Sequence, residues 1–315
     1  MNTPKHSVDE LKKEWVISSI DGTSASINGY KGTEHSITLP SQAGTRQITQ
    51  IGERAFRPES HKQFRAVYRE LTSVVIPEPI NYIGHMAFAN CKNLKEVVLP
   101  KTLNHIMYSA FENCCSLKRI EIPASLYSLD SDVFRNCRNL TECIFHSHDT
   151  KINGSAFFGC ESLKQVKVRE PDDTLADHLI QTGMYRPYHY SFCGCTSLES
   201  AKFAPDNKVI SEGIFYGCTS LKDIVLPEST EYICSNAFRE CESITHFSIP
   251  RAVKVICNWA FLKMINLELV DVFSPDVDID PSAFKGCQKV TFRSYKGSTT
   301  EQFCKENGFP FVPFC

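Results

Sequence analysis

The 315-residue chain has 34 lysine and arginine residues against 36 aspartate and glutamate residues, a formal net charge of -2. This balance excludes an overall field that favours nucleic acid or an anionic membrane. No apolar stretch approaches the roughly 20 residues of a membrane-spanning helix, and the first residues show no signal-peptide segment. We interpret most of the 15 cysteines as reduced. We therefore expect a cytoplasmic protein with no membrane insertion. A secreted or cell-surface location is the alternative if the chain is truncated.

The N-terminal segment, residues 1–36, has its own pattern. Short alternating apolar runs are separated by the pairs Asp21-Gly22 and Asn28-Gly29, which favour tight turns between antiparallel strands. We interpret the segment as β-hairpins that cap the apolar end of the structure that follows.

An insertion near residues 57–70 interrupts the sequence before the first regular repeat. It gathers the basic side chains of Arg57, Lys62, Arg65 and Arg69, which would attract an acidic partner. The alternative interpretation is ordinary solvated charge on a loop.

A 23-residue repeat fills most of residues 37–289. Its pattern is L-x-x-I-x-I-P, then a second apolar position and A-F-x-x-C. Copies begin at Leu71, Leu94, Leu117, Leu140, Leu163, Leu198, Leu221, Ile244 and Leu267, and all intervals are 23 residues except 35 between Leu163 and Leu198. Because one such unit is too short to bury its own apolar side, neighbouring copies must stack.

Each copy predicts the same local structure. The alternation of Val97 and Leu99 indicates a short strand that Pro100 ends, and Ile106 marks a second inward position. The A-F-x-x-C segment is compatible with a single helical or 3₁₀ turn. The predicted fold is a β-dominant α/β repeat solenoid, a right-handed superhelix with short strands and single helical turns, capped at both ends in one continuous domain.

Two columns of the repeat predict the core. Phenylalanine fills one column at positions 88, 111, 134, 157, 192, 215, 238, 261 and 284, and the other holds Cys91, Cys114, Cys137, Cys160, Cys195, Cys218, Cys241, Met264 and Cys287. Buried thiols behave as small hydrophobic groups, and Met264 in the same column favours packing over a metal or redox ladder. Cys234 and Cys257 share another position in adjacent copies, without the spacing of a zinc site.

The segment His146 to Asp149 replaces the usual turn after a strand. His146 and His148 would coordinate a metal if their imidazoles lay on one side, whereas a solvated turn is the simpler interpretation. No motif of an activated nucleophile, phosphate loop or metalloprotease is present. We therefore expect no enzyme, no catalytic residue, no cofactor and no metal site.

The longer insertion, residues 170–190, is the strongest candidate for partner binding. Its first part resembles a capped amphipathic helix that ends at Gly183. Residue types common at interaction hot spots follow, namely Tyr185, Arg186, Tyr188, His189 and Tyr190. The alternative is that these rings only anchor the loop to a neighbouring coil.

The C-terminal segment, residues 290–315, diverges from the repeat as expected for a cap. Val290 opens a last strand, and residues Thr300 to Asn307 predict a short helix before the closing sequence FPFVPFC.

With these motifs in hand, the chain resembles the BspA-like leucine-rich-repeat family over roughly residues 37–315. The matching residues are Ile76-Pro77, Ile83-Gly84, Ala87-Phe88 and Cys91 to Leu94. The resemblance implies a leucine-rich-repeat solenoid and a binding role, since members are commonly surface or secreted proteins associated with adhesion and host-protein binding.

We interpret the chain as a non-enzymatic recognition or adhesion-type scaffold for a protein or glycan partner of unidentified nature. Binding would use the 170–190 insertion or the outward strand positions, such as Glu96, Arg119, Lys202, Asp223 and His246. The alternatives are an intracellular assembly or regulatory scaffold and, more weakly, a metal-dependent enzyme built on His146 and His148.

Overall fold

The computed structural model describes residues 8–169, 175–177, 179–180 and 189–315, and divides the chain into two compact units. Unit one comprises Met1–Lys151 and Val166–Ala176, and unit two comprises Ile152–Gln165 and Asp177–Cys315. The sequence favoured one continuous domain. The division falls where the insertion breaks the 23-residue spacing, because each coil of a solenoid contacts only its neighbours.

Unit one begins with a helix and one hairpin. Helix α1 (Val8–Glu14) precedes β1 (Trp15–Ser19) and β2 (Ser24–Tyr30), which pair antiparallel. Asp21 closes the turn by accepting the backbone N–H groups of Thr23 at 2.7 Å and Ser24 at 2.8 Å. The expected cap is thus one hairpin with a helix that alternation alone does not reveal.

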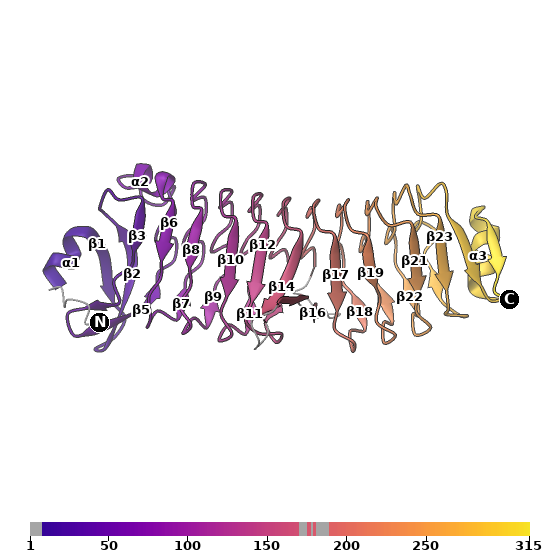
Figure 1. Ribbon diagram of the computed structural model, residues 1–315, viewed down its shortest axis with the longest axis horizontal. Coiled ribbons are helices and arrows are strands. Elements are labelled where there is room, and N and C mark those ends of the chain that lie inside the picture. Colours follow the sequence, from indigo (N-terminus) through magenta and orange to yellow (C-terminus); the bar gives the residue numbers. More distant parts are fainter. Residues whose placement is uncertain (1–7, 170–174, 178, 181–188) are drawn as a thin grey trace. The chain divides into compact units, whose positions relative to one another are not determined.

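The coils of unit one carry two sets of parallel strands (Figure 1). The first set is β3 (Ser36–Thr38), β6 (Ser73–Val75), β8 (Glu96–Val98), β10 (Arg119–Ile122), β12 (Glu142–Phe145) and β14 (Gln165–Arg169). The second is β5 (Arg46–Ile51), with β4 (Gln42–Ala43) at its side, β7 (Tyr82–Ile83), β9 (His105–Ile106), β11 (Ser128–Leu129) and β13 (Lys151–Ile152). Strands pair one repeat apart, as Val74 opposite Val97 shows.

Unit two repeats this arrangement. Its first set of strands is β17 (Ser200–Phe203), β19 (Asp223–Val225), β21 (His246–Ile249), β23 (Leu269–Val272), β25 (Thr291–Ser294) and β26 (Phe311–Pro313). Its second set is β18 (Val209–Ile210), β20 (Tyr232–Ile233), β22 (Val255–Ile256) and β24 (Asp278–Ile279). The expected C-terminal helix is present as α3 (Thr299–Asn307), with Ser298 as N-cap and Gly308 as left-handed C-cap.

The described residues of the 170–190 insertion contradict the prediction of a helix. Its described residues form two short strands, β15 (Leu175–Asp177) and β16 (Leu179–Ile180). β16 pairs in parallel with β17, with Leu179 opposite Lys202 and Ile180 opposite Phe203. Pairing to a neighbouring strand therefore overrides the helical pattern of a short segment.

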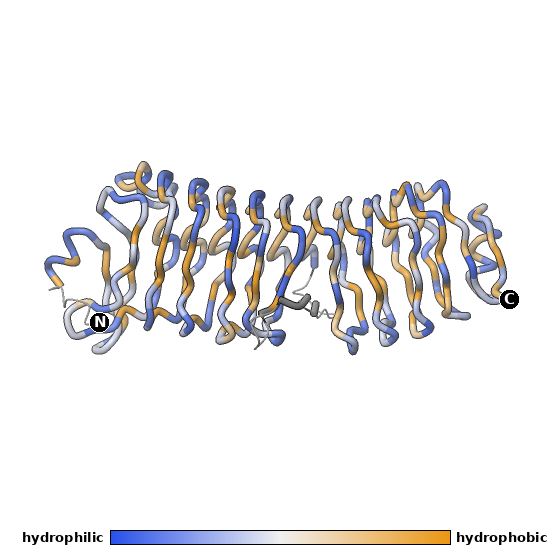
Figure 2. Tube along the Cα trace, in the orientation of Figure 1, coloured by the Kyte–Doolittle hydropathy of each residue, from blue (hydrophilic) through white to orange (hydrophobic). Residues whose placement is uncertain are grey.

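The phenylalanine column forms the core of each unit. Consecutive rings stack with centroids 5.3 Å apart for Phe88 and Phe111, and 4.6 Å apart for Phe261 and Phe284. Every ring of the column is fully buried. Apolar and polar residues alternate along each coil in Figure 2. The predicted solenoid is confirmed.

The cysteine column lies beside the rings. Its thiols donate to the phenylalanine carbonyls of the preceding coil, as Cys114 does to Phe88 O at 3.3 Å and Cys218 to Phe192 O at 3.1 Å. Burial raises the pKa of both thiols well above the ordinary value. These sulfurs are packed, protonated core groups.

The A-F-x-x-C segment is a run of turns rather than a regular helix. Some backbone N–H groups donate to the carbonyl three residues earlier, as Ala89 does to Met86 O. The N–H groups between them donate to a carbonyl of the next coil, as Phe88 does to Ala110 O. Two residues of the turn are left-handed, for example Met86 and Asn90 with φ 53° and 66°. The compact turn expected from the spacing is present, and its left-handed residues bond one coil to the next.

Candidate interaction surface

Three aromatic side chains form a ladder at the surface of unit two, in which Phe273 and Tyr295 are exposed and Phe314 is half-buried. Phe273, Tyr295 and Phe314 directly follow β23, β25 and β26. Ring centroids are 5.2 Å apart for Phe273 and Phe314 and 5.2 Å apart for Tyr295 and Phe314. Phe273 is 40% exposed and Tyr295 is 42% exposed. Aromatic surface of this size normally packs inside a protein, so the ladder is a contact candidate.

The ladder exists because the strands continue past the point where proline ends them in earlier copies. Pro227 and Pro250 hold this position after β19 and β21. Here the N–H of Phe273 donates to Ile249 O at 3.0 Å, and that of Phe314 donates to Ser294 O at 2.8 Å. Proline has no such donor. An aromatic residue therefore extends the strand and, by alternation, shares the face of the residue two positions earlier.

A charged cluster lies on that same face. Both carboxylate oxygens of Asp271 are engaged, by Arg293 Nε at 2.5 Å and Nη2 at 2.7 Å, and by His246 Nε2 at 2.9 Å. Arg293 and then His246 lower the pKa of Asp271. Its side chain is only 6% exposed. The bidentate pair thus fixes an exposed guanidinium beside the rings.

An apolar depression lies beside β17 and β19 in the same unit. It has a volume of about 340 Å³ and is lined mainly by Ala201, Phe203, Pro205, Val225 and Pro227. Val225 is 81% exposed. We call the aromatic ladder, the charged cluster and this depression together the strand face of unit two; β17, β19, β21 and β23 lie side by side in Figure 1.

Several outward strand positions of unit one carry charged side chains that pair with one another. Arg119 bonds Glu121 at 2.7 Å and Glu142 at 2.5 Å, and His146 Nε2 lies 2.9 Å from Glu121. A depression of about 480 Å³ beside β8 and β10 includes Glu96 in its lining. Exposed pairs of this kind contribute little binding or folding energy.

The two histidines considered as metal ligands have other surroundings. His146 interacts with Glu121 as described, and His148 is exposed. Within the described part of the chain, no group of three or more His, Cys, Asp or Glu side chains is placed to hold a metal ion. The absence of a metal site stays a prediction.

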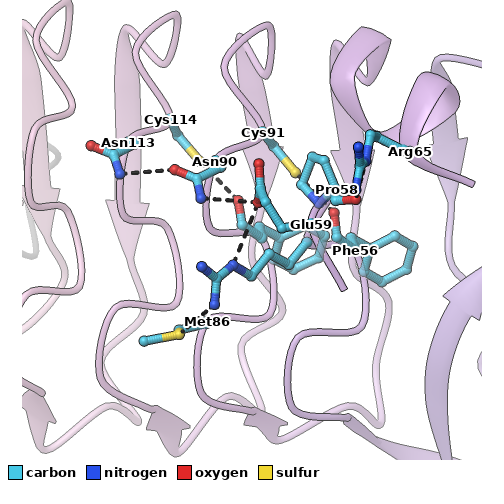
Figure 3. A network of polar contacts seen from close by, with 11 residues as sticks. Phe56, Pro58, Glu59, Arg65, Met86, Asn90, Cys91, Asn113 and Cys114 are labelled. Carbon is cyan, nitrogen blue, oxygen red and sulfur yellow. Dashed lines mark hydrogen bonds and ion pairs between the residues drawn. The ribbon is translucent and has the colours of Figure 1, made fainter. Parts of the chain in front are cut away.

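The basic insertion of unit one splits into buried and exposed members. Arg57 is half-buried, with its Nη1 3.1 Å from Met86 Sδ and its Nε 3.5 Å from Glu59 (Figure 3). Arg65, in α2 (Arg65–Glu70), donates to Pro58 O at 3.4 Å. Lys62 and Arg69 are exposed. Two of the four cations therefore serve local packing.

Of the residues proposed in the longer insertion, Tyr185, Arg186 and Tyr188 lie outside the described residues. His189 Nδ1 lies 3.4 Å from Glu212, and the Tyr190 hydroxyl donates to Glu212 at 2.9 Å. A side chain at Gly213 would meet the Tyr190 ring at 2.2 Å. Tyr190 thus anchors the chain to the next coil, the alternative weighed from the sequence.

Sequence reasoning missed the aromatic ladder. The available signal was the replacement of the strand-ending proline by Phe273 and Tyr295 in consecutive copies. That signal is obscured because Val270 pairs with Phe292, so the spacing between the last two copies is 22 residues rather than 23. An alignment at 23 residues therefore does not place Tyr295 in the column of Phe273.

No helix in the described ranges is long and apolar enough to cross a membrane.

Comparisons with known proteins agree with this architecture. The family profile described as BspA type leucine rich repeat region, with 6 copies, matches residues 60–186 and 180–291. The leucine-rich-repeat protein TpLRR of T. pallidum is 27% identical, covering 67% of this chain and 89% of that one, with a TM-score of 0.51.

Two further solved structures share lower identity. A leucine rich cell surface protein of Faecalibacterium prausnitzii is 21% identical, covering 92% of this chain and 95% of that one, with a TM-score of 0.39. The pneumococcal vaccine antigen PcpA is 18% identical, covering 96% of each chain, with a TM-score of 0.49. The comparison with curated proteins gave no match.

Proposed function

Because the chain belongs to the BspA-type leucine-rich-repeat family, whose repeats are typical of interaction scaffolds, we propose that it is a non-enzymatic recognition scaffold that binds a protein partner through the strand face of unit two. The observation that carries this proposal is the aromatic ladder of Phe273, Tyr295 and Phe314 beside the fixed guanidinium of Arg293. Aromatic residues and arginine dominate the energy of protein interfaces.

A protein partner fits this surface better than a glycan. A glycan site places polar groups, such as carboxylates or amides, directly beside the rings to bond the sugar hydroxyls. Both oxygens of Asp271 are already bonded to Arg293 and His246. The surface presents aromatic rings, an apolar depression and a guanidinium cation. These features fit a partner protein in which an acidic group flanks an apolar side chain.

The test is quantitative capture by the purified full chain. Immobilised wild type and the double variant Phe273→Ser, Tyr295→Ser are incubated with proteins of the native environment, and bound proteins are quantified by mass spectrometry. Trp259→Ser is the matched control, because Trp259 is 43% exposed but lies in the turn segment of the same unit.

We expect at least one protein to be retained by wild type and the control and lost from the double variant. Removing a hot-spot ring costs about 2 kcal/mol or more, which weakens binding roughly 30-fold. Equal capture by wild type and the double variant would rule out this surface. Binding of glycans alone, on an array of sugars, would also reject the proposal.

Cellular location stays a proposal. We propose a reducing, cytoplasmic setting in which the scaffold serves assembly or regulation, supported by its many thiols. Fractionation of the native cell tests it, and recovery of the chain outside the cell would favour adhesion instead.

A further inference from the structure

Two cysteines occupy equivalent positions in adjacent coils of unit two. In the sheet formed by β18, β20, β22 and β24, Ile210, Ile233, Ile256 and Ile279 lie in register. The residues that follow them are Ser211, Cys234, Cys257 and Asp280. Cys234 N–H donates to Ile210 O and Cys257 N–H donates to Ile233 O, both at 2.9 Å, so the parallel ladder continues through the pair.

The pair differs from the buried cysteine column. The isoleucines before it are buried, and alternation turns the next side chain to the opposite side. Cys234 and Cys257 are accordingly half-buried, whereas the column thiols are inaccessible. A solvent-borne ligand has access to this pair.

The two thiols also interact with each other. Hydrogen bonding to Cys234 lowers the pKa of Cys257 to about 7, while the same contact raises the pKa of Cys234. The two sulfurs therefore lie within hydrogen-bonding reach of each other. Thiolate is the form of cysteine that binds metals.

Strand spacing favours a bridging ion over a disulfide. Neighbouring strands lie about 4.8 Å apart, and equivalent side chains run parallel. A disulfide needs Cβ atoms about 3.5 to 4.5 Å apart. Zinc–thiolate bonds are about 2.3 Å long, and two metal–sulfur bonds of about this length placed end to end span about 4.6 Å, close to the strand spacing.

The surroundings favour a cation. Glu212, Asp278 and Asp280 lie close enough to act electrostatically on Cys257. Ser211, opposite Cys234 in the preceding coil, is 1% exposed, and its hydroxyl has no hydrogen-bond partner among the described residues. An unpaired oxygen thus lies in the column next to the sulfurs.

We propose that Cys234 and Cys257 bind one Cu(I) ion as a two-coordinate bis-thiolate site. Thiolates are soft ligands that favour Cu(I), zinc and iron–sulfur clusters over hard cations, and two thiolates fall short of the four ligands of a structural zinc site. Starting from two thiols, one Cu(I) replaces two protons, two copper–sulfur bonds form, and no atom changes oxidation state. A search for C-x-x-C spacing misses this site because its ligands are one coil apart.

Anaerobic titration of the reduced full chain tests the site. Cu(I) is supplied from a complex with a chromophoric chelator, and transfer to protein is read from the loss of chelator absorbance. Variants Cys234→Ser and Cys257→Ser are compared with Cys115→Ser, a half-buried cysteine of unit one, and Cys315→Ser, an exposed one. Circular dichroism melting verifies that each variant is folded.

We expect one tightly bound Cu(I) per chain in wild type and in both control variants. Loss of a group that hydrogen-bonds to a metal ligand weakens metal binding about 10 to 100-fold, so loss of a sulfur ligand itself should weaken binding more than about 100-fold. Bound Cu(I) should also suppress the alkylation of Cys257.

Unchanged Cu(I) binding in folded Cys257→Ser would overturn the proposal. It would equally fail if reduced wild type bound no Cu(I), including the case in which air oxidation links Cys234 to Cys257 in tryptic peptides. Neither result bears on the strand face, because that surface is tested by protein capture.

Discussion

Single side chains in the phenylalanine column carry much of the folding energy. Phe238 is fully buried between Phe215 at 5.8 Å and Phe261 at 5.5 Å, with Phe247 edge-on at 4.9 Å. Phe238→Ala removes these contacts and leaves a cavity that the coil above and the coil below hold open. We expect a loss of about 3 to 5 kcal/mol, measured by urea denaturation.

The matched control is Val225→Ala in the same unit. Val225 is 81% exposed, so its truncation should change stability by less than about 0.5 kcal/mol. Equal midpoints for Phe238→Ala and wild type would mean that the ring is not enclosed by its neighbours.

The residue scale is also where sequence reasoning succeeded most. Phe88 and Cys91 could be assigned to the core because a 23-residue period returns each to one place in every coil. The sequence also places Cys234 and Cys257 at one position of adjacent copies, but their exposure needed the structure, since a sequence column does not report which side chains face solvent. The charged cluster around Asp271 also needed the structure, because Asp271 of β23 lies opposite Arg293 of β25 at a spacing of 22 residues instead of 23.

At the scale of elements, the turn segments link the coils of unit one through an asparagine ladder. Asn113 donates to Asn90 at 2.8 Å, and Asn90 donates to Glu59 at 3.0 Å (Figure 3). On its other side Asn113 accepts from Asn136 at 3.0 Å. Each asparagine has φ between 58° and 66°. Asparagine tolerates this left-handed backbone better than most residues.

Asn113→Ala should therefore cost stability twice, by ending the ladder and by placing a Cβ-bearing residue without polar support at φ 59°. We expect about 2 kcal/mol, from two lost hydrogen bonds and backbone strain. Asn113→Gly should lose less, because glycine adopts this backbone freely. Both are measured by urea denaturation against Asn139→Ala, an exposed asparagine of the same unit. If alanine and glycine gave identical losses, backbone strain would play no part.

Elements were predicted well where the repeat is regular and poorly where it stops. The strand, the second inward position and the turn of each coil follow from spacing alone, whereas the second strand at that inward position was not predicted. The insertion before β17 has helical periodicity, yet Leu179 and Ile180 pair with Lys202 and Phe203. Helix α1 was missed for a related reason: seven residues with one buried side chain, Leu11, give too weak a pattern.

At the scale of the whole molecule, a stacked array needs its ends covered, since an open coil exposes apolar side chains and unpaired strand groups. At the C-terminus of unit two, β26 covers the edge of β25; Pro310 precedes this strand and Pro313 is its last residue. Proline on an edge strand limits further pairing. The same strand places Phe314 in the aromatic ladder, so the cap also completes the candidate interaction surface.

Docking of helix α3 should decide whether this end stays closed. Phe303 is 6% exposed and contacts Phe292 at 5.7 Å, Phe309 at 5.7 Å and Phe284 at 6.2 Å. Phe303→Asp would bury an unpaired carboxylate there, at a cost of about 3 kcal/mol or more. We expect a lower melting temperature and concentration-dependent light scattering, because the last coil becomes exposed. Lys305→Ala, which loses only the exposed pair with Glu301, should behave as wild type; scattering equal to wild type in Phe303→Asp would show that the array does not depend on this cap.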